Sequence, residues 1–449
     1  MSLLNRKESL VLFLGDLVSF VVALWLSLLI RGLDVPSKDL FLTHLLPFSL
    51  LFVLWILVFY IAGLYEKHTA ILKSKLPSIL ANTQLANSAL AVVFFYFIPF
   101  FGITPKTILF IYLFVSFALV LFWRMYGYFV IGHSRPNKAI LIGSGDEMKE
   151  LYEEVNNNSI YNIKFISSVD LNRADEKGFW DEIISRIYSE DVSVIAIDLA
   201  NKNVEPVLPH LYNLIFSKIN FIDMHKIYED IFDRVPLSLL KYNWFLENIS
   251  TRPRGGYDAL KRLMDVVISL PLFVLSLFLF PFVWIAIKVE DRGSIFIRQE
   301  RVGKNNKHIQ IVKLRTMSGS DTNNAVLRSN LIVTKTGKFF RASRIDELPQ
   351  LWNVLKGDIS LIGPRPELPA LAKHYEDEVP FYNVRHLIKP GLSGWGQIND
   401  YDVPRKGIDV EKTKRKLSYD LYYIKNRSFL LDIKIALKTL KTLVSIAGR

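Results

Sequence analysis

The segment with the clearest chemical potential runs from Arg341 to Pro366, where two adjacent carboxylates lie among basic residues. Asp346 and Glu347 precede apolar residues at helical spacing that end before Gly357, so the pattern predicts a helix with both carboxylates in its first turn. Carboxylates in a first turn commonly do no more than complement the helix dipole. The pair alone therefore indicates no particular chemistry.

The basic residues around this pair favour a chemical role. They are Arg298, Lys313, Arg315, Arg341, Arg344, Lys356 and Arg365. Lys313 and Arg315 alternate on a predicted strand and are expected to share one face, while Arg365 lies in a stiff Gly-Pro-Arg-Pro loop. In phosphoryl transfer a carboxylate attacks phosphorus or binds a divalent metal, and cations neutralise the phosphate oxygens. The segment fits that chemistry, whereas simple surface ion pairs would not need the rigid glycine–proline framing.

Composition narrows the class of protein. The chain has 449 residues, 51% of them hydrophobic, and no cysteine. Disorder is excluded, and so are disulfides, zinc–thiolate sites and thiol nucleophiles. The net charge is +12, and residues 251–449 hold 34 Lys and Arg against 19 Asp and Glu. This basic C-terminal half predicts an anionic partner, for which nucleic acid, a lipid surface and a phosphorylated substrate are the candidates.

Four apolar stretches precede these segments, at about residues 9–30, 41–64, 79–101 and 107–131. Each is near the ~20 residues that a helix needs to cross a bilayer. Lys and Arg concentrate before the first stretch, between the second and third, and after the fourth, which places both ends of the predicted bundle in the cytoplasm. Asp16 lies inside the first stretch, and we expect it to face the bundle and to pair with a partner there rather than to relay protons.

Residues 137–250 alternate short β runs with helical stretches, which predicts an α/β domain with a parallel sheet. Lys138–Ile142 should form a strand that leads into Gly143-Ser-Gly145. These glycines resemble the start of a dinucleotide-binding fingerprint, but Met148 stands where its third glycine should be. A tight strand-to-helix turn is the preferred interpretation.

A linker at residues 251–257 precedes a fifth apolar run, Leu263–Ile287, which contains Pro271 and Pro281. Proline bends a helix, and basic residues lie at both ends of the run. It is therefore either a kinked span or a hairpin that enters and leaves by the same face. We favour the re-entrant hairpin, because a full crossing would move the Lys- and Arg-rich remainder out of the cytoplasm.

Motifs spread over residues 258–449 resemble the bacterial sugar transferases, the polyprenyl-phosphate hexose-1-phosphate transferases. They are Lys261-Arg-Leu-Met-Asp265, Arg298-Gln-Glu-Arg-Val-Gly303, Lys313-Leu-Arg-Thr-Met317, Asp346-Glu-Leu-Pro-Gln-Leu-Trp-Asn-Val-Leu-Lys-Gly-Asp358, Gly363-Pro-Arg-Pro366, Lys389-Pro-Gly-Leu-Ser-Gly-Trp-Gly-Gln-Ile-Asn399 and Asp420-Leu-Tyr-Tyr-Ile424. Four spans followed by an α/β domain resemble the large members of the family. One departure is Leu277-Phe278, which occupies the place of the family's helix-breaking Ser-Pro.

The resemblance implies a fold and an activity. The fold is a membrane protein with a four-helix transmembrane region (1–136), a Rossmann-like cytoplasmic α/β domain (137–250), a linker (251–257) and a monotopic catalytic domain with a re-entrant membrane helix (258–449). The activity is transfer of a sugar 1-phosphate from a nucleotide diphosphate sugar, usually a UDP-sugar, to undecaprenyl phosphate, with Mg²⁺ required and a nucleoside monophosphate released. Such a reaction initiates the assembly of a surface glycan such as exopolysaccharide, capsule or O-antigen.

The same resemblance assigns roles to residues. Asp346 matches the nucleophile that forms a covalent phosphosugar intermediate, and Glu347 matches its partner, so both are expected at the metal. Phosphate binding is expected from Lys313, Arg315, Arg341, Arg365 and Arg298. The expected setting is the inner membrane of a bacterial cell, with the catalytic domain on the cytoplasmic face, membrane lipid as a partner and a homodimer as the assembly.

Two other functions remain open from the sequence. A membrane-bound NAD-dependent nucleotide-sugar dehydratase or epimerase would use a Tyr-x-x-x-Lys pair, and Tyr257 and Lys261 have that spacing. However, they lie just before an apolar run rather than in a Rossmann helix. A transporter or scaffold that binds lipid or nucleic acid is the second alternative, although no nucleic-acid module is recognisable, so no nucleic-acid partner is expected.

Overall fold

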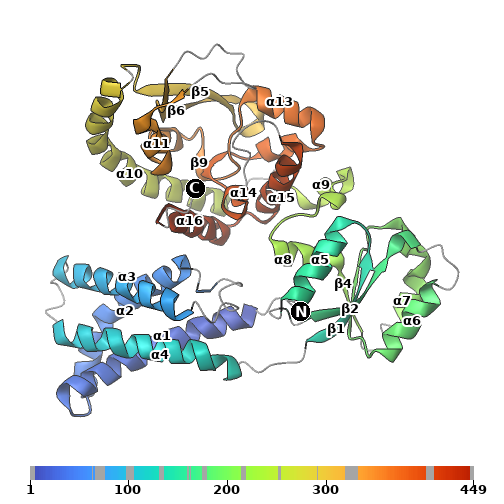
Figure 1. Cartoon of the computed structure of the whole chain (residues 1–449), viewed down its shortest axis with the longest axis horizontal. Helices are drawn as coiled ribbons and strands as arrows, with labels where there is room; N and C mark the ends of the chain where they lie inside the picture. The colour runs from blue at the N-terminus through green and yellow to red at the C-terminus, as the bar shows by residue number, and fades with distance from the viewer. Residues whose placement is uncertain are drawn as a thin grey trace. The chain divides into compact units, whose positions relative to one another are not determined.

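The computed structural model describes residues 6–62, 64–65, 76–97, 106–130, 136–158, 161, 163–173, 179–213, 219–250, 254–290, 292–318, 332–400 and 409–444. The chain divides into two compact units, Met1–Ile227 and Tyr228–Arg449. Each unit is described by itself below, and both can be followed in Figure 1.

The first unit begins with four long helices. They are α1 (Arg6–Gly32), α2 (Lys38–Ile61), α3 (Leu76–Phe97) and α4 (Lys106–Val130). Their core is aromatic, with the rings of Phe20, Phe48, Trp55 and Tyr112 fully buried or nearly so. Three stretches, Leu10–Gly32, Lys38–Ile61 and Ile108–Tyr126, are long and apolar enough to cross a membrane. The apolar segment Leu80–Phe95 lies in α3, and residues 98–101 of the stretch expected from the sequence lie outside the described residues.

A buried ion pair joins α1 to α4. The Arg124 guanidinium donates from Nε to Asp16 Oδ1 over 3.1 Å and makes a second contact to Oδ2. The Tyr65 hydroxyl donates to the same carboxylate over 2.7 Å, and Arg124 also donates to the Leu64 carbonyl. A charge in an apolar bundle is costly unless it is paired, and this arrangement confirms the expectation that Asp16 faces a partner inside the bundle.

The first unit continues into a four-stranded parallel sheet. Its strands are β1 (Asn137–Gly143), β2 (Ile163–Asp170), β3 (Val194–Ile197) and β4 (Asn220–Asp223), in the order β2-β1-β3-β4. The helices that alternate with them are α5 (Asp146–Asn157), α6 (Phe179–Ser189) and α7 (Leu208–Asn213). The central strands are buried, as both faces of a parallel sheet normally are. The predicted parallel α/β organisation is confirmed.

The second unit begins before the predicted linker. Residues 228–249 include most of α8 (Met224–Phe232) and all of α9 (Tyr242–Asn248). Val235 and Trp244 pack in one core with Leu417 and Leu421, near the far end of the chain. The sequence predicted the boundary at residue 250, because the Arg- and Gly-rich segment that follows has the composition of a linker. In the structure, the apolar contacts of Val235 and Trp244 make the residues before this segment part of the second unit.

The fifth apolar run forms one long helix, α10 (Gly255–Glu290), of 36 residues, with Pro271 and Pro281 inside it. It is the fourth helix that is long and apolar enough to cross a membrane. Figure 1 shows α10 bent, so that it curves along one side of the second unit. Most of its large apolar side chains are exposed, including Leu277 and Phe278, as expected of a helix whose natural neighbour is lipid.

Short elements build the rest of the second unit. The strands are β5 (Phe296–Val302), β6 (His308–Leu314), β7 (Met317–Ser318), β8 (Ile332–Val333), β9 (Ser360–Ile362) and β10 (Gly391–Ser393). The helices are α11 (Lys335–Ala342), α12 (Gln350–Lys356), α13 (Pro369–Glu378), α14 (Trp395–Asn399), α15 (Val410–Asn426) and α16 (Phe429–Val444). β5 and β6 form an antiparallel hairpin, while β9 and β10 pair in parallel.

Two basic residues of α16 pack against a neighbouring helix. Lys434 and Lys438 lie over the Trp395 ring, with their ammonium groups 4.8 and 5.1 Å from its centre. Cation–π attraction and the apolar stems of the lysines favour this packing over exposure to lipid headgroups. Two of the basic residues therefore hold α16 against α14, and the exposed large residues of α16 are apolar, Leu430 and Leu440 among them.

Candidate active site

Asp346 and Glu347 lie in a 3₁₀ turn, Ile345–Glu347, rather than in the first turn of an α-helix as predicted. The α-helix α12 begins only at Gln350, because Pro349 has no N–H to donate and interrupts the α-helical hydrogen bonds. Arg344 precedes the turn in the left-handed conformation, with φ of 60°. The two carboxylates therefore lie in the 3₁₀ turn, before the regular helix α12 begins.

Two arginines hold Glu347. Its Oε1 lies 3.3 Å from an Arg365 nitrogen and 3.6 Å from an Arg344 nitrogen. Burial alone would raise the pKa of Glu347, but the charges of Arg365, Lys313 and Arg344 outweigh it and hold that pKa below its usual value. Glu347 is therefore an anion locked to Arg365 at neutral pH.

Asp346 differs from its neighbour. Its Oδ1 is buried and has no hydrogen-bond partner among the described residues. Burial and the adjacent Glu347 charge raise the pKa of Asp346, against the opposing effect of Lys313 and nearby arginines. A buried carboxylate oxygen without a donor is rare in a folded protein and calls for an explanation. Here it leaves a lone pair available for a bond to phosphorus or to a metal ion.

The β5–β6 hairpin supplies two cations to the same place. Burial, together with the Arg365 and Arg301 charges, lowers the pKa of Lys313 to about 8. Burial also lowers the pKa of Arg301 to about 10. With Glu347 and Arg365 they line a small cavity of about 10 Å³, which is the room that one water molecule needs. Cations that are buried together and repel one another are poised to accept an anion.

Arg365 is held through its backbone. Arg385 donates to the Arg365 carbonyl over 3.0 Å, and Arg301 donates to the Pro366 carbonyl over 3.2 Å. A Cβ added to Gly391 would lie 2.1 Å from the Gly363 nitrogen, so the two chain segments touch directly. The Gly-Pro-Arg-Pro loop therefore has little freedom to move, and the position of the Arg365 side chain is restricted with it.

A buried charge network contacts this loop, and no pattern in the sequence assigned its members a role. Arg385 is 2.8 Å from Asp420 and 3.6 Å from Glu367, and Lys416 donates to Glu367 over 2.5 Å. All four side chains are largely or fully buried. The available signal was Asp420 inside the otherwise apolar Asp-Leu-Tyr-Tyr-Ile run. The network supports Arg365 because Arg385 belongs to both.

Helix α12 is fixed to its surroundings by buried polar contacts. Asn353 donates to the Gln310 carbonyl over 2.7 Å and accepts from the Val312 N–H, which joins α12 to β6. Arg262 of α10 donates to the last carbonyls of α12, those of Val354 and Leu355. The turn that carries Asp346 and Glu347 is thus held between the membrane helix and the hairpin.

The other predicted phosphate ligands are placed unequally. Arg341 is exposed and donates to the Thr316 hydroxyl over 3.0 Å, and its charge acts on Asp346. Arg298 is exposed on β5 and is absent from the cavity lining, where Arg301 of the same strand lies instead. Arg315 follows the end of β6 and is also absent from that lining. The structure thus brings Lys313, Glu347 and Arg365 together beside Asp346, but neither Arg298 nor Arg315 joins them in the cavity.

The arrangement can accept a divalent cation only in company with an anion. Among the described residues there is no group of three or more His, Asp or Glu side chains with metal-binding geometry. Mg²⁺, however, commonly binds through one or two carboxylates plus substrate phosphates. The unpartnered Asp346 Oδ1 and the adjacent Glu347 fit that requirement, while the surrounding cations oppose a metal that arrives without a phosphate.

The structure does not support the dehydratase alternative. Tyr257 and Lys261 lie on α10, and both donate to the buried Asp432 carboxylate. The glycine turn of the α/β domain is also filled, because a Cβ on Gly143 would lie 2.7 Å from Met224 Sδ.

The carboxyl ends of β3 and β4 carry acidic side chains, with Asp198 and Asp223 within 3.5 Å of a His225 ring nitrogen. Burial would lower the pKa of His225, but these carboxylates raise it. Such a site offers nothing to a pyrophosphate, which needs backbone N–H groups and positive charge.

Comparison with known proteins agrees with the geometry. Residues 256–446 match the family model described as bacterial sugar transferase. A UDP-N-acetylgalactosamine-undecaprenyl-phosphate N-acetylgalactosaminephosphotransferase of Aeromonas hydrophila is 41% identical over 205 residues, 44% of this chain and 47% of that protein. A UDP-glucose:undecaprenyl-phosphate glucose-1-phosphate transferase of Klebsiella pneumoniae is 35% identical over 42% of this chain and 41% of its own length.

The matched region spans less than half the length of those two relatives. A UDP-glucose:undecaprenyl-phosphate glucose-1-phosphate transferase of Caulobacter vibrioides is covered more fully, at 39% identity over 198 residues, 43% of this chain and 73% of that protein. The family-model match, residues 256–446, includes Asp346, Glu347 and Arg365. The chain belongs to the bacterial sugar transferase family.

Proposed function

We propose that the protein transfers a sugar 1-phosphate from a UDP-sugar to undecaprenyl phosphate, and so initiates assembly of a surface glycan. The observation that carries the proposal is the buried, unpartnered Asp346 oxygen beside Lys313 and the Glu347–Arg365 pair. Relatives named for this transfer are 35–41% identical to this chain over 192–205 residues. Both substrates are anionic and one is a lipid, which agrees with a basic unit carrying a long apolar helix.

The reaction proceeds in two displacements at one phosphorus atom. An Asp346 carboxylate oxygen attacks the phosphorus that bears the sugar, forming an O–P bond while the bond to the UMP oxygen breaks and UMP leaves. An oxygen of the lipid phosphate then attacks the same phosphorus, the bond to Asp346 breaks, and the free carboxylate returns. Covalent catalysis divides the transfer, so the two large substrates need not occupy the site together.

The cations around Asp346 have distinct tasks in these steps. Arg365, fixed by its loop and by Glu347, is placed to bind phosphate oxygens and to stabilise the charge that develops in both transition states. Lys313 adds an ammonium whose pKa is lowered by burial and by the Arg365 and Arg301 charges. Mg²⁺ is the proposed cofactor; Asp346 and Glu347 would hold it, and it would supply neutralisation of the diphosphate.

The proposal is tested by nucleotide release from the full-length protein in nanodiscs. Wild type is expected to release about one equivalent of UMP per site without acceptor, and to carry radiolabelled sugar phosphate, in the manner of a covalent intermediate. Asp346→Asn keeps the shape but removes the nucleophile, so it should abolish both signals, a loss of roughly a thousandfold or more in rate. Asp377→Asn on α13 is the matched control and should behave as wild type.

Two results would contradict the mechanism. If label never attaches to wild type in the absence of acceptor, the lipid phosphate must attack directly. If Asp346→Asn turns over at a near-normal rate, another group is the nucleophile. A screen of UDP- and GDP-sugars by the same assay names the donor.

The membrane arrangement is also a proposal. We infer that α10 enters and leaves the bilayer by the cytoplasmic face of the inner membrane, which keeps the basic second unit inside the cell. The bend of α10 and its two prolines support this path. The chain has no cysteine, so single thiols at Gly255→Cys and Lys288→Cys can be labelled from one side. Labelling of both from the cytoplasm is expected, and labelling from opposite sides would refute it.

Two further parts of the architecture belong with this proposal. The α/β domain is inferred to be Rossmann-like without a redox cofactor, because its glycine turn is filled by methionine and its strand ends are acidic. The homodimer rests on the family resemblance, and cross-linking in native membranes tests it.

A further inference from the structure

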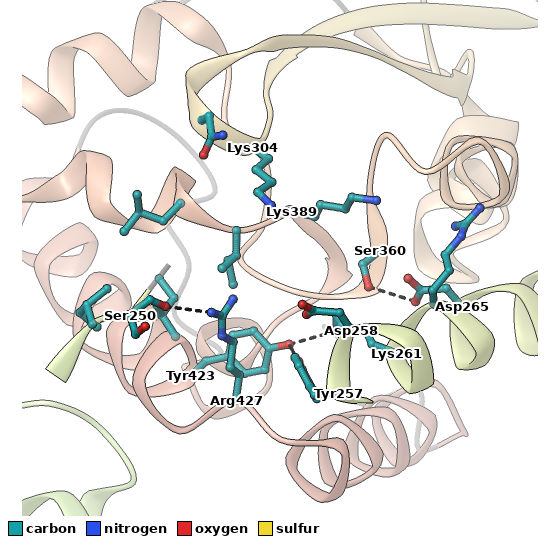
Figure 2. A pocket seen from close by; sticks show the side chains of 16 residues that line it. Ser250, Tyr257, Asp258, Lys261, Asp265, Lys304, Ser360, Lys389, Tyr423 and Arg427 are labelled. Atoms are coloured by element: carbon teal, nitrogen blue, oxygen red, sulfur yellow. Dashed lines mark hydrogen bonds between the residues drawn. The ribbon is translucent and has the colours of Figure 1, made fainter. Parts of the chain in front are cut away.

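A second cavity, of about 400 Å³, lies in the second unit where α10 begins. Figure 2 shows the side chains that line it. The active-site loop follows the carboxyl end of β9, whereas Ser360, at the amino end of that strand, lines this cavity. Strands rise about 3.3 Å per residue, so the cavity lies roughly 10 Å from the start of the loop. No residue lines both cavities.

The lining is predominantly cationic. It contains five basic side chains, Lys261, Arg262, Lys304, Lys389 and Arg427, and two carboxylates, Asp258 and Asp265. Both carboxylates already accept hydrogen bonds, Asp258 from the Arg254 N–H and Asp265 from the Ser360 hydroxyl and the Leu361 N–H. Positive charge in this cavity is therefore only partly balanced from within.

Three of the cationic groups have capacity to spare. The ammonium groups of Lys304 and Lys389 have no hydrogen-bond or ion-pair partner among the described residues. The Arg427 Nε is buried and likewise has no partner there, although the other side of its guanidinium donates to the Ser250 carbonyl over 3.0 Å. Figure 2 shows Lys304 and Arg427 reaching into the cavity from opposite sides.

The other two cations are already used. Lys261 binds Asp432, and Arg262 binds the carbonyls at the end of α12. Burial and the Arg262 and Lys304 charges lower the pKa of Lys389. Mutual repulsion of this kind is relieved when an anion binds between the cations.

We propose that this cavity is a second binding site for a phosphate group, held by Lys304, Lys389 and Arg427. Three convergent cationic donors suit the oxygens of a tetrahedral anion. The phosphate belongs either to a phospholipid headgroup or to a small soluble phosphate. The first source can reach the site because the cavity is lined by the first three turns of the apolar helix α10, which also carry the exposed side chain of Leu263. The site goes beyond the proposed transfer reaction and does not depend on it.

The test is lysine footprinting of the full-length protein in nanodiscs. Phosphate bound at Lys389 raises its pKa again and covers its nitrogen, so acetylation at fixed pH should slow several-fold. Lys307, on the same β5–β6 hairpin as Lys304, and Lys373 on α13 do not line the cavity. They serve as matched controls for bulk surface effects. Three conditions are compared: digalactosyldiacylglycerol, a lipid without phosphate, the same lipid with inorganic phosphate, and phosphatidylglycerol in its place.

The outcomes separate the two sources. Selective protection of Lys304 and Lys389 by inorganic phosphate identifies a soluble phosphate, and selective protection by phosphatidylglycerol alone identifies a lipid headgroup. Lys304→Glu should remove the protection of Lys389. The melting temperature of this variant shows whether its fold is intact. If the fold is lost, the milder variant Lys304→Gln is used instead. Equal acetylation of Lys389 in all three conditions, or protection shared by Lys307 and Lys373, overturns the proposal.

Discussion

Replacement of Arg385 by methionine should destabilise the second unit and disturb the active-site loop together. Arg385 is buried, 2.8 Å from Asp420 and 3.6 Å from Glu367, and it donates to the Arg365 carbonyl. Removal of one member of a buried ion pair costs about 3–5 kcal/mol, because a charge is left without its partner. For a unit of this size 1 kcal/mol corresponds to about 2–4 °C, so the melting temperature should fall by about 6–20 °C.

The pH dependence of this loss has a definite sign. Burial raises the pKa of Asp420, and Arg385 opposes that rise. Without Arg385 the pKa of Asp420 should rise further, so the folded variant favours the protonated acid. Its stability deficit relative to wild type should therefore shrink as the pH falls through that raised pKa. The double variant Arg385→Met with Asp420→Asn should recover part of the loss at neutral pH, because no unpaired carboxylate remains at residue 420.

The measurement is thermal unfolding of the detergent-solubilised full chain, followed by UMP release on the folded fraction. Lys373→Met, at an exposed position on α13, is the control for loss of a cationic side chain. The reasoning is refuted if Arg385→Met melts within about 2 °C of wild type, or if the Asp420→Asn change fails to restore any stability. A variant that melts low but keeps full activity would show that Arg385 supports the fold without positioning Arg365.

Two further outcomes follow from the site. Lys313 has a pKa of about 8 and loses its charge as the pH rises through that value. The kcat/KM for the sugar donor should therefore decline above pH 8, and Lys313→Arg should move this decline to higher pH. A pH profile unchanged by that substitution would argue against phosphate binding by Lys313. Gly391→Ala places a methyl group 2.1 Å from the Gly363 nitrogen, and the resulting strain should destabilise the fold by about 1–3 kcal/mol. Both the melting temperature and the activity should therefore fall. A variant that matches wild type in unfolding and UMP release would show that the loop can shift.

The sequence was sufficient for features that depend on local pattern. Apolar length predicted the long helices, and alternating β and helical runs predicted the parallel sheet. An acid in an apolar stretch predicted that Asp16 pairs inside the bundle, but not that Arg124 is its partner. In each case the signal lies within one segment, because it comes from periodicity or from the cost of burying a charge.

The sequence was insufficient where distant segments meet. Arg385 and Asp420 belong to different elements, and charged residues of this kind are usually exposed, so their burial follows only from tertiary packing. The side of β5 on which each arginine lies was also not predicted: Arg301 rather than Arg298 faces the cavity. Pro349 was visible in the sequence, and its missing N–H was the signal that the expected helix would start late.

The core shared by Val235, Trp244, Leu417 and Leu421 has a practical consequence for dissecting the protein. The recognisable family region starts at residue 256, and an expression fragment designed on it would lack both Val235 and Trp244. The apolar surface of α15 that these side chains cover would then meet solvent, which favours aggregation over folding. A fragment that begins at Tyr228, the start of the second compact unit, keeps this cover.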